Sequence, residues 1–370
     1  MFGKKIIKLL SVSSCLLCLA CSVQAKEDLG EELAAGQPAP KPRQNPPKLL
    51  KVAFVGDSGY GSAYKKVLQL IKREHVDLVL HLGDLGYDED NNQAPKKWDA
   101  MVTEVLGQNF PYIFIIGNHD RNHWHQKNPE GYGVFLRRRL EANKAIHCVG
   151  EEGIKAYCTY HGLFFVLSGI GTSGQGHEDF IRHALSQAND YNWRICAWHK
   201  NQRDMQAGTK PDEVGWLAYR LCQEQGAMIA TGHEHSYARS RTLQELGNAS
   251  KNHGASGDPR RVELDRGKTF VFVSGLGGHS LRPFDCQRQN SRKWWASVLT
   301  SNFYMENDLV KYDTCDEDDK ALKILNAKPA NSYGALFVTF HDQDDPRLAK
   351  GEFKTIDNTI MDAFVIRTKL

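Results

Sequence analysis

Several apolar stretches of this chain are followed directly by side chains that can bind a metal ion or move a proton. Carboxylate, amide, phenolate and imidazole groups are donors for first-row metals. They gather in five segments, as Asp57, Asp84, Tyr87, Asn118, His119, Asp120, His199, His233 and His235. Even without His119 and Asp120 they are too many for one six-coordinate ion that also binds water and substrate. They suit two ions that share a carboxylate, and two ions about 3.5–4 Å apart can bind a phosphoryl group and activate a hydroxide.

These donors lie at the carboxyl ends of segments that we predict to be short buried strands. The segments are VAFVGDSG, VLHLGDLGY, IFIIGNHD, ICAWHK and MIATGHEH. Ligands of open α/β sheets bind at that edge, and a Gly before the donor permits a sharp turn and close backbone approach. The sequence contains no Walker A loop, GxSxG elbow or cysteine-based zinc ribbon.

The metal-binding side chains must be positioned by secondary structure, and strands and helices are predicted to alternate in the first part of the chain. Apolar runs bounded by Gly or polar residues predict strands over 51–55, 78–82, 112–116, 164–167, 194–198, 228–230 and 269–273. Helical spacing predicts helices around 64–71, 180–185 and 214–222, the last begun by Pro211-Asp212. This alternation implies parallel strands with helical crossovers. The regions 333–340 and 353–366 are strand-rich, so we predict layered α/β structure with two packed sheets.

The ordered set GDxG, GDxxY, GNHD, a lone strand-end His and GHxH resembles the calcineurin-like metallophosphoesterases. Tyr87 after Asp84, and Asp57-Ser58-Gly59 without the Asp-x-His of most members, resemble the purple acid phosphatase branch. The resemblance runs from about 49 to 370. It implies a four-layer αββα sandwich, with two mixed β-sheets flanked by helices.

The resemblance also implies a role for each donor. Asp57, Tyr87 and His235 would bind a ferric ion, and Asp84 would bridge to a second, divalent ion of iron, zinc or manganese. Asn118, His199 and His233 would hold that second ion. His119 would touch the phosphate and protonate the leaving alcohol, and Asp120 would orient His119.

The function implied is an exported binuclear phosphomonoesterase, similar to an acid phosphatase, acting on a small-molecule phosphoester. A phosphodiesterase or nucleotidase of the same superfamily is an alternative. A non-catalytic exported protein that binds metal or phosphate is an alternative of another class.

Other residues near the motifs leave two interpretations open. Lys200 either adds charge near a phosphate or points to solvent, and Arg239 is a weak candidate for a phosphate contact. The cluster of His123, Trp124 and His125 is predicted to be a surface loop. Of the remaining histidines, His177 and His279 are expected to come nearest to the site.

The N-terminus is typical of an export signal. A basic start and an apolar run over 9–20, followed by Val23-Gln24-Ala25, predict a signal peptide over 1–25. A lipid anchor at Cys21 is the runner-up. The Pro-rich region 26–48 reads as a flexible linker, and 49–370 as the catalytic domain. The mature chain is expected to lack a transmembrane span and to be periplasmic or secreted.

Composition and cysteines agree with such a protein. With 41% hydrophobic and 25% charged residues the chain is globular. Without residues 1–25, which hold three of the 47 basic residues, 44 basic residues balance 44 acidic ones, so no nucleic-acid partner is expected.

Six cysteines follow Ala25. Cys148 with Cys158, and Cys286 with Cys315, are plausible disulfides, whereas Cys196 and Cys222 are expected to be buried small hydrophobes.

Overall fold

The structure is a computed structural model that describes residues 49–127, 129–287, 293–315 and 332–370. The predicted signal peptide (1–25), the linker (26–48) and the lipid anchor at Cys21 lie outside these residues and stay predictions. No helix in the described part of the chain is both long enough and apolar enough to cross a membrane.

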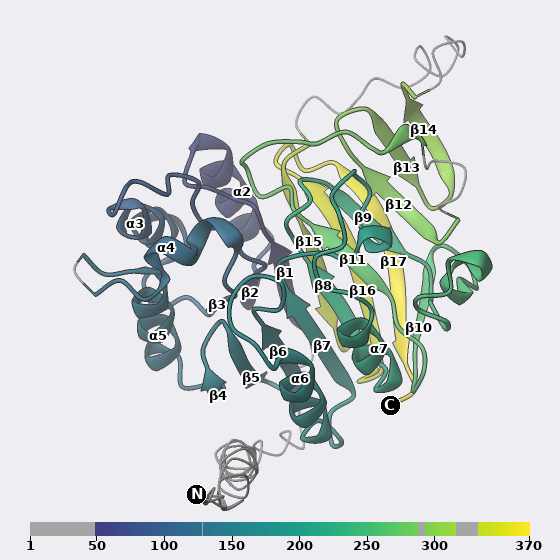
Figure 1. Cartoon of the computed structure of the whole chain (residues 1–370), viewed down its shortest axis with the longest axis horizontal. Helices are drawn as coiled ribbons and strands as arrows, with labels where there is room; N and C mark the ends of the chain where they lie inside the picture. The colour runs from purple at the N-terminus through teal and green to yellow at the C-terminus, as the bar shows by residue number, and fades with distance from the viewer. Residues whose placement is uncertain (1–48, 128, 288–292, 316–331) are drawn as a thin grey trace, which may run out of the picture. The chain divides into compact units, whose positions relative to one another are not determined.

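One sheet joins the first and last strands of the described chain. Its order is β10-β17-β16-β15-β1-β2-β3 (Figure 1). β1, β2 and β3 pair in parallel, and β1 pairs antiparallel with β15 on its other side. The strands are β1 (Leu50–Val55), β2 (Leu78–His81), β3 (Tyr112–Phe114), β10 (Arg261–Leu264), β15 (Gly334–Phe340), β16 (Leu348–Thr355) and β17 (Ile360–Thr368).

The second sheet has the order β14-β13-β12-β9-β11-β8-β7-β6-β5-β4. Its centre, β6-β7-β8-β11, is parallel. The strands are β4 (Ile146–Glu151), β5 (Lys155–Tyr160), β6 (Leu163–Ser168), β7 (Trp193–Trp198), β8 (Met228–Thr231), β9 (Tyr237–Ser240), β11 (Val271–Ser274), β12 (Trp295–Leu299), β13 (Phe303–Glu306) and β14 (Leu309–Asp313). The predicted parallel pairing is therefore present in both sheets.

Helices cover the outer faces of the two sheets. The helices are α2 (Ser62–Arg73), α3 (Ala94–Leu106), α4 (Arg121–Trp124), α5 (Tyr132–Ala142), α6 (His177–Ser186) and α7 (Leu217–Glu224). α2 contacts β15 and α5 contacts β3, whereas α6 contacts β6 and α7 contacts β8 (Figure 1). The order is thus helix, sheet, sheet, helix, as predicted.

The alternation of side chains along β1 shows how the layers are held. Leu50, Val52 and Phe54 lie in the core between the sheets, together with residues of β6 and β7. Ala53 and Val55 face the other way and pack with α2 and α3. A parallel strand buried on both faces needs such a continuous apolar run, which explains why the strand is visible in the sequence.

The helix predicted from Pro211-Asp212 begins later, at Leu217. The Asp212 carboxylate instead accepts hydrogen bonds from the N–H groups of Val214 and Gly215, and Gly215 has a φ of 73°. An Asp that bonds its own following backbone favours a turn over a helix. The acidic residue therefore closes a loop, and the helix starts after it.

The predicted disulfides Cys148–Cys158 and Cys286–Cys315 are both present. Cys196 and Cys222 are buried, as predicted, but they were wrongly read as separate small hydrophobes, because they form a disulfide. Cys196 points from β7 into the core beneath α7, and Cys222 lies on the buried face of that helix. Helix packing on the sheet brings the two sulfur atoms together, which their isolated patterns do not reveal.

A buried ion pair ties the two sheets together. Asp362 on β17 accepts hydrogen bonds from Arg239 Nε at 2.6 Å and Nη2 at 3.0 Å, from Tyr237 at 2.7 Å and from Ser297 at 2.8 Å. Arg239 and Asp362 are both 0% exposed. Arg239 is therefore occupied in the core, and the hypothesis that it meets a phosphate is wrong.

A second carboxylate joins α2 to the first sheet. Glu74, which caps α2, accepts hydrogen bonds from Lys51 at 3.1 Å and from Lys354 at 3.0 Å. Burial acts to raise the pKa of Glu74, but the two lysine contacts outweigh it and lower the pKa below its ordinary value. The charged form is therefore the one that stabilises the fold.

Candidate metal centre

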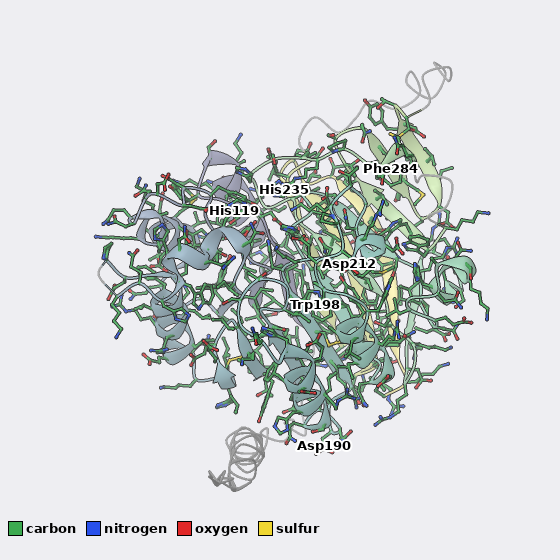
Figure 2. The ribbon with its side chains drawn as sticks, in the orientation of Figure 1. His119, Asp190, Trp198, Asp212, His235 and Phe284 are labelled. Atoms are coloured by element: carbon green, nitrogen blue, oxygen red, sulfur yellow. A yellow bond between two sulfur atoms is a disulfide. The ribbon has the colours of Figure 1, made fainter. Side chains whose placement is uncertain are left out.

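The metal-binding side chains predicted from the sequence converge where the parallel strands of both sheets end. Asp57 follows β1, Asp84 follows β2 and Asn118 follows β3, while His199 follows β7 and His233 follows β8. The Gly56 N–H donates to the Ser274 carbonyl at 2.8 Å, and this bond joins the ends of β1 and β11. Two sheets thus supply one site, and Figure 2 labels His119 and His235 among these loops.

The loops that carry these ligands have unusual backbones. Asp57, Asp84 and His233 adopt positive φ values of 57°, 57° and 67°. Such values are costly for residues other than glycine and cluster at functional sites. A Cβ on Gly83 would lie 2.7 Å from His199 Nδ1, so only glycine lets the loop after β2 approach this histidine.

Two groups of donors meet in the centre and share one member. Asp84, His199 and His233 form one group, and Asp57, Asp84 and His235 form the other. Within each group the donor atoms all lie within 4.8 Å of one another. Because Asp84 belongs to both, its carboxylate has the position that a bridging ligand needs.

The first group directs several metal-binding atoms toward one position. His199 Nδ1–H donates to the Leu82 carbonyl at 2.8 Å, so Nε2 of the neutral ring is a lone pair. That atom lies 3.2 Å from Asp84 Oδ2, 3.1 Å from Asn118 Oδ1 and 3.2 Å from His233 Nδ1. His233 donates from Nε2 to Glu213 at 2.6 Å, so its Nδ1 also presents a lone pair. A proton or a metal cation would satisfy this arrangement, and the imidazole, carboxylate and amide donors fit a metal ion.

The second group includes the predicted tyrosine. Tyr87 Oη lies 3.1 Å from His235 Nε2 and 3.3 Å from Asp57 Oδ1. His235 Nδ1 is held by the Ser280 hydroxyl at 2.6 Å, which leaves Nε2 facing the group. Burial and the Asp57 charge raise the pKa of Tyr87 well above its ordinary value. A phenolate here therefore needs a strong cation beside it.

The electrostatics of the centre also favour a cation. Burial acts to raise the pKa of Asp84, but His199 outweighs it and lowers the pKa well below its ordinary range. Burial acts to lower the pKa of His199, but Asp84 outweighs it and raises the pKa to about 9. In the protein alone a proton would balance the carboxylates, and a metal ion would have to displace it.

His119 lies beside this centre, with its Nε2 4.0 Å from Asp84 Oδ2. Its Nδ1 donates to Glu89 at 2.5 Å. The prediction that Asp120 orients the His119 ring was wrong. Asp120 is buried and accepts hydrogen bonds from the N–H groups of Asp84, Leu85, Gly86 and Gly117 at 2.8 to 3.4 Å. Asp120 therefore joins the two ligand loops, because its side chain turns inward while that of His119 turns to the site.

The His123–His125 segment was also misread. His123 and Trp124 are buried in α4 instead of forming a surface loop, and His123 Nε2–H donates to the Glu89 carbonyl at 2.8 Å. His123 thus supports the residue that holds His119. His177 bonds Ser168 and Ser173 away from the centre, whereas His279 stacks on Tyr87.

Sequence analysis missed three residues that support the site, Glu89, Glu213 and Ser280, whereas its expectation that His279 lies near the site is confirmed. Glu213 lies between His233 and Lys200, whose Nζ donates to it at 2.5 Å. Lys200 is therefore held by Glu213 and not turned freely to solvent. None of these three belongs to a strand-end motif, so no spacing signal identifies them.

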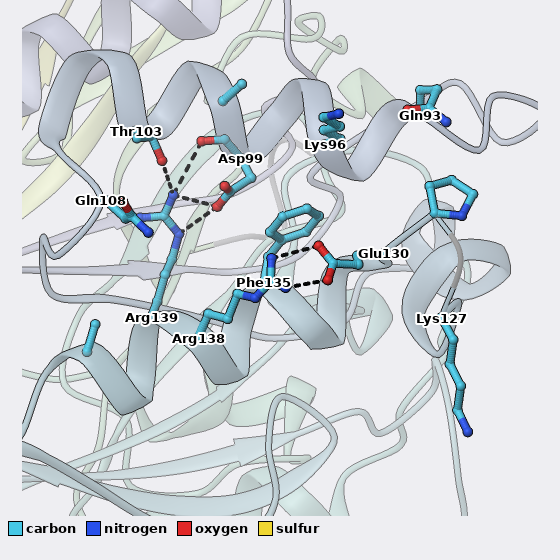
Figure 3. Close-up of a pocket in the computed structure, with 13 residues that line it drawn as sticks. Gln93, Lys96, Asp99, Thr103, Gln108, Lys127, Glu130, Phe135, Arg138 and Arg139 are labelled. Atoms are coloured by element: carbon cyan, nitrogen blue, oxygen red, sulfur yellow. Dashed lines mark hydrogen bonds and ion pairs between the residues drawn. The ribbon is translucent and has the colours of Figure 1, made fainter.

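A cavity of about 780 Å³ lies elsewhere, between α3 and α5 (Figure 3). Its wall includes Arg139, bonded to Asp99 at 2.6 Å and Thr103 at 3.0 Å, and Arg138, paired with Glu130. No proposed metal ligand lines this cavity. The two arginines of its wall are paired, so the converging donors at the strand ends remain the candidate site.

Fold and site together define a protein with two candidate cation-binding groups, which share Asp84, at the strand ends of two packed sheets. The family described as calcineurin-like phosphoesterase matches residues 50–237. The chain therefore belongs to this family. A search of curated proteins found no match.

Solved structures share the fold at low sequence identity. Purple acid phosphatase PPD1 from yellow lupin (Lupinus luteus) is 17% identical, with a TM-score of 0.59, over 89% of this chain and 55% of that chain. PhoD is 14% identical, with a TM-score of 0.51, over 86% and 68%. GAP50, described as the anchor in the inner membrane complex of Plasmodium, is 12% identical, with a TM-score of 0.51, over 87% and 90%. The chain spans about half the length of the lupin protein.

Proposed function

We propose that this protein is an exported, binuclear metal-dependent phosphoesterase that hydrolyses phosphomonoesters, similar to purple acid phosphatases. The observation that carries the proposal is the convergence of two donor groups on Asp84. A pair of ions held there would supply positive charge for a phosphoryl group and lower the pKa of a water molecule. Asp57, Tyr87 and His235 would hold one ion. Asn118, His199 and His233 would hold the other.

The protein's own residues would then manage the leaving group. Glu89 holds His119 through Nδ1, so the Nε2 atom is the one directed toward the centre. A proton at Nε2 would pass to the oxygen of the departing alcohol, which is general acid catalysis. Asp120 would keep the loops after β2 and β3 together, so that the ligands and His119 stay in register.

Differential loss of metal tests this assignment. Asp84→Ala removes a donor common to both groups, so we expect it to abolish binding of the metal pair. Asp57→Ala removes a donor from one group, so we expect one ion to remain. Both variants should lose hydrolysis of p-nitrophenyl phosphate. Metal content measured on the assayed sample checks this, and full activity of Asp84→Ala without bound metal would contradict the proposal.

The substrate class and the metal need separate measurements. Comparison of p-nitrophenyl phosphate with its bis-ester distinguishes a monoesterase from a phosphodiesterase or nucleotidase of the same family. A metal-loaded protein without turnover on a panel of phosphoesters would favour a non-catalytic binding role. A ferric ion on Tyr87 predicts a visible charge-transfer band that Tyr87→Phe removes. A colourless active enzyme would exclude a ferric ion on Tyr87 but would leave the proposed two-metal phosphoesterase activity intact.

Export is supported by the cysteines. Three disulfides join all six cysteines that follow Ala25. Such bonds persist in oxidising compartments and are rare in reducing ones. Fusion of residues 1–25 to a reporter that is active only after export tests the signal. Mass measurement of the mature chain distinguishes cleavage after Ala25 from lipid attachment at Cys21.

A further inference from the structure

The entrance to the metal centre is made of rings. The proposed ligands at its base are nearly inaccessible, since Asp57 and His199 are 0% exposed and His233 is 7% exposed. Tyr87 is half-buried, the His119 side chain is 32% exposed, and His279 is exposed. A group that approaches the centre from solvent therefore meets these rings before it reaches the carboxylates.

His279 is held at this entrance by backbone and ring contacts. Its N–H donates to the Asp57 carbonyl at 3.2 Å. Its ring lies parallel to that of Tyr87, with centroids 3.5 Å apart and planes 8° apart. The ring also stands perpendicular to that of His235, with centroids 5.4 Å apart. These contacts place an imidazole directly against two proposed ligands of the first ion.

The His279 ring differs from the other imidazoles of the centre in its hydrogen bonds. His119 bonds Glu89, His233 bonds Glu213 and His235 bonds Ser280. In the part of the chain that the structure describes, the ring nitrogens of His279 have no hydrogen-bond partner. Tyr333 contacts only its backbone carbonyl, at 3.4 Å.

This arrangement leaves a donor available at the entrance. Either neutral tautomer of imidazole has one N–H, so a donor is present without added charge. The His279 ring lies against Tyr87 and His235, two proposed ligands of the first ion, so it borders the place where a phosphoryl group would bind. The ring is fixed by stacking, and its polar atoms are free to contact a ligand.

We propose that His279 binds substrate, by donating a hydrogen bond to a phosphoryl oxygen of the ester. The inference rests on the proposed function and adds a substrate-binding residue to it. The residue is contributed by the loop after β11, which no proposed metal ligand occupies. A hydrogen bond to a charged group changes affinity about 10- to 100-fold.

The test uses the metal-loaded enzyme with inorganic phosphate and p-nitrophenyl phosphate. His279→Phe keeps a ring against Tyr87 and removes the N–H, whereas His279→Ala removes both. We expect each variant to raise KM and the inhibition constant of phosphate about 10-fold or more, with unchanged metal content and a much smaller change in kcat. His279→Gln, which restores a donor, should recover part of the affinity. His147→Phe, an exposed histidine on β4, is the control and should behave as wild type.

Two results would overturn the inference. His279→Phe with wild-type KM and phosphate inhibition would show that the N–H makes no contact. Loss in His279→Ala alone would show that the ring acts only by stacking. Failure of the proposed function looks different, because the wild-type holoenzyme would then hydrolyse no ester. Phosphate binding by calorimetry, on the same holoenzyme and variants, still tests His279 in that case.

Discussion

Removal of the Glu213 carboxylate should weaken binding of one ion and not the other. Glu213 accepts a hydrogen bond from His233 Nε2 at 2.6 Å, and Lys200 donates to the same carboxylate at 2.5 Å. This contact fixes the tautomer in which His233 Nδ1 is a free lone pair. Without it the ring can carry its proton on Nδ1, which would block the ligand position.

The magnitude follows from this geometry. Loss of a partner that orients a ligating histidine reduces metal affinity about 10- to 100-fold, which corresponds to about 1.4–2.7 kcal/mol. The contact is short and made to a carboxylate, so Glu213→Ala should reach the upper part of this range. Glu213→Gln should lose less, because an amide oxygen still accepts from Nε2. Binding of the ion proposed at Asp57 and His235 should be unaffected, since the described structure shows no contact of either residue with Glu213.

Competition with a chelator, followed by metal analysis, measures the two affinities separately. Glu263→Ala is the matched control, because Glu263 also pairs with a lysine, Lys268 at 3.2 Å, but contacts no histidine of the centre. Equal affinities for Glu213→Ala and wild type, within twofold, would refute the reasoning. An equal loss in Glu263→Ala would refute it as well.

Three further predictions concern the fold that carries the site. Asp362→Ala leaves the Arg239 guanidinium buried without its partner, so we expect a loss of about 3–5 kcal/mol in urea unfolding; a loss below about 1 kcal/mol would contradict the buried network. Replacement of Cys196 and Cys222 together by Ala should lower the unfolding free energy by about 2–4 kcal/mol, measured without reductant, and unchanged stability would argue against that disulfide. The lowered pKa of Glu74 means that the unfolded chain takes up this proton at a higher pH than the folded one. The stabilisation from the charged Glu74 is therefore present at neutral pH and disappears as the pH falls below about 4.5. Glu74→Gln should lower the unfolding free energy at pH 7, and this variant should lose less stability than wild type on acidification. Identical profiles of unfolding free energy against pH would count against the lysine contacts.

The strands and the primary donors were visible in the sequence because each depends on local pattern. A buried parallel strand must be apolar throughout, so β1, β2, β7 and β8 could be located within one or two residues. A donor that follows such a strand reaches the carboxyl edge of the sheet by chain direction alone. The convergence of Asp57, Asp84, His199, His233 and His235 therefore followed from four separate segments.

The contacts that support these donors depend on which loops pack together, and only the tertiary structure decides that. Glu89, and not Asp120, is the partner of the His119 ring, because the Asp120 carboxylate accepts hydrogen bonds from backbone N–H groups of the loops instead. Arg239 forms an ion pair with Asp362, which is 123 residues away in the sequence, and Cys196 forms a disulfide with Cys222 across a helix–sheet interface. The spacing of residues along the chain carries the direction of a strand, but not the identity of the side chain that folding places opposite it.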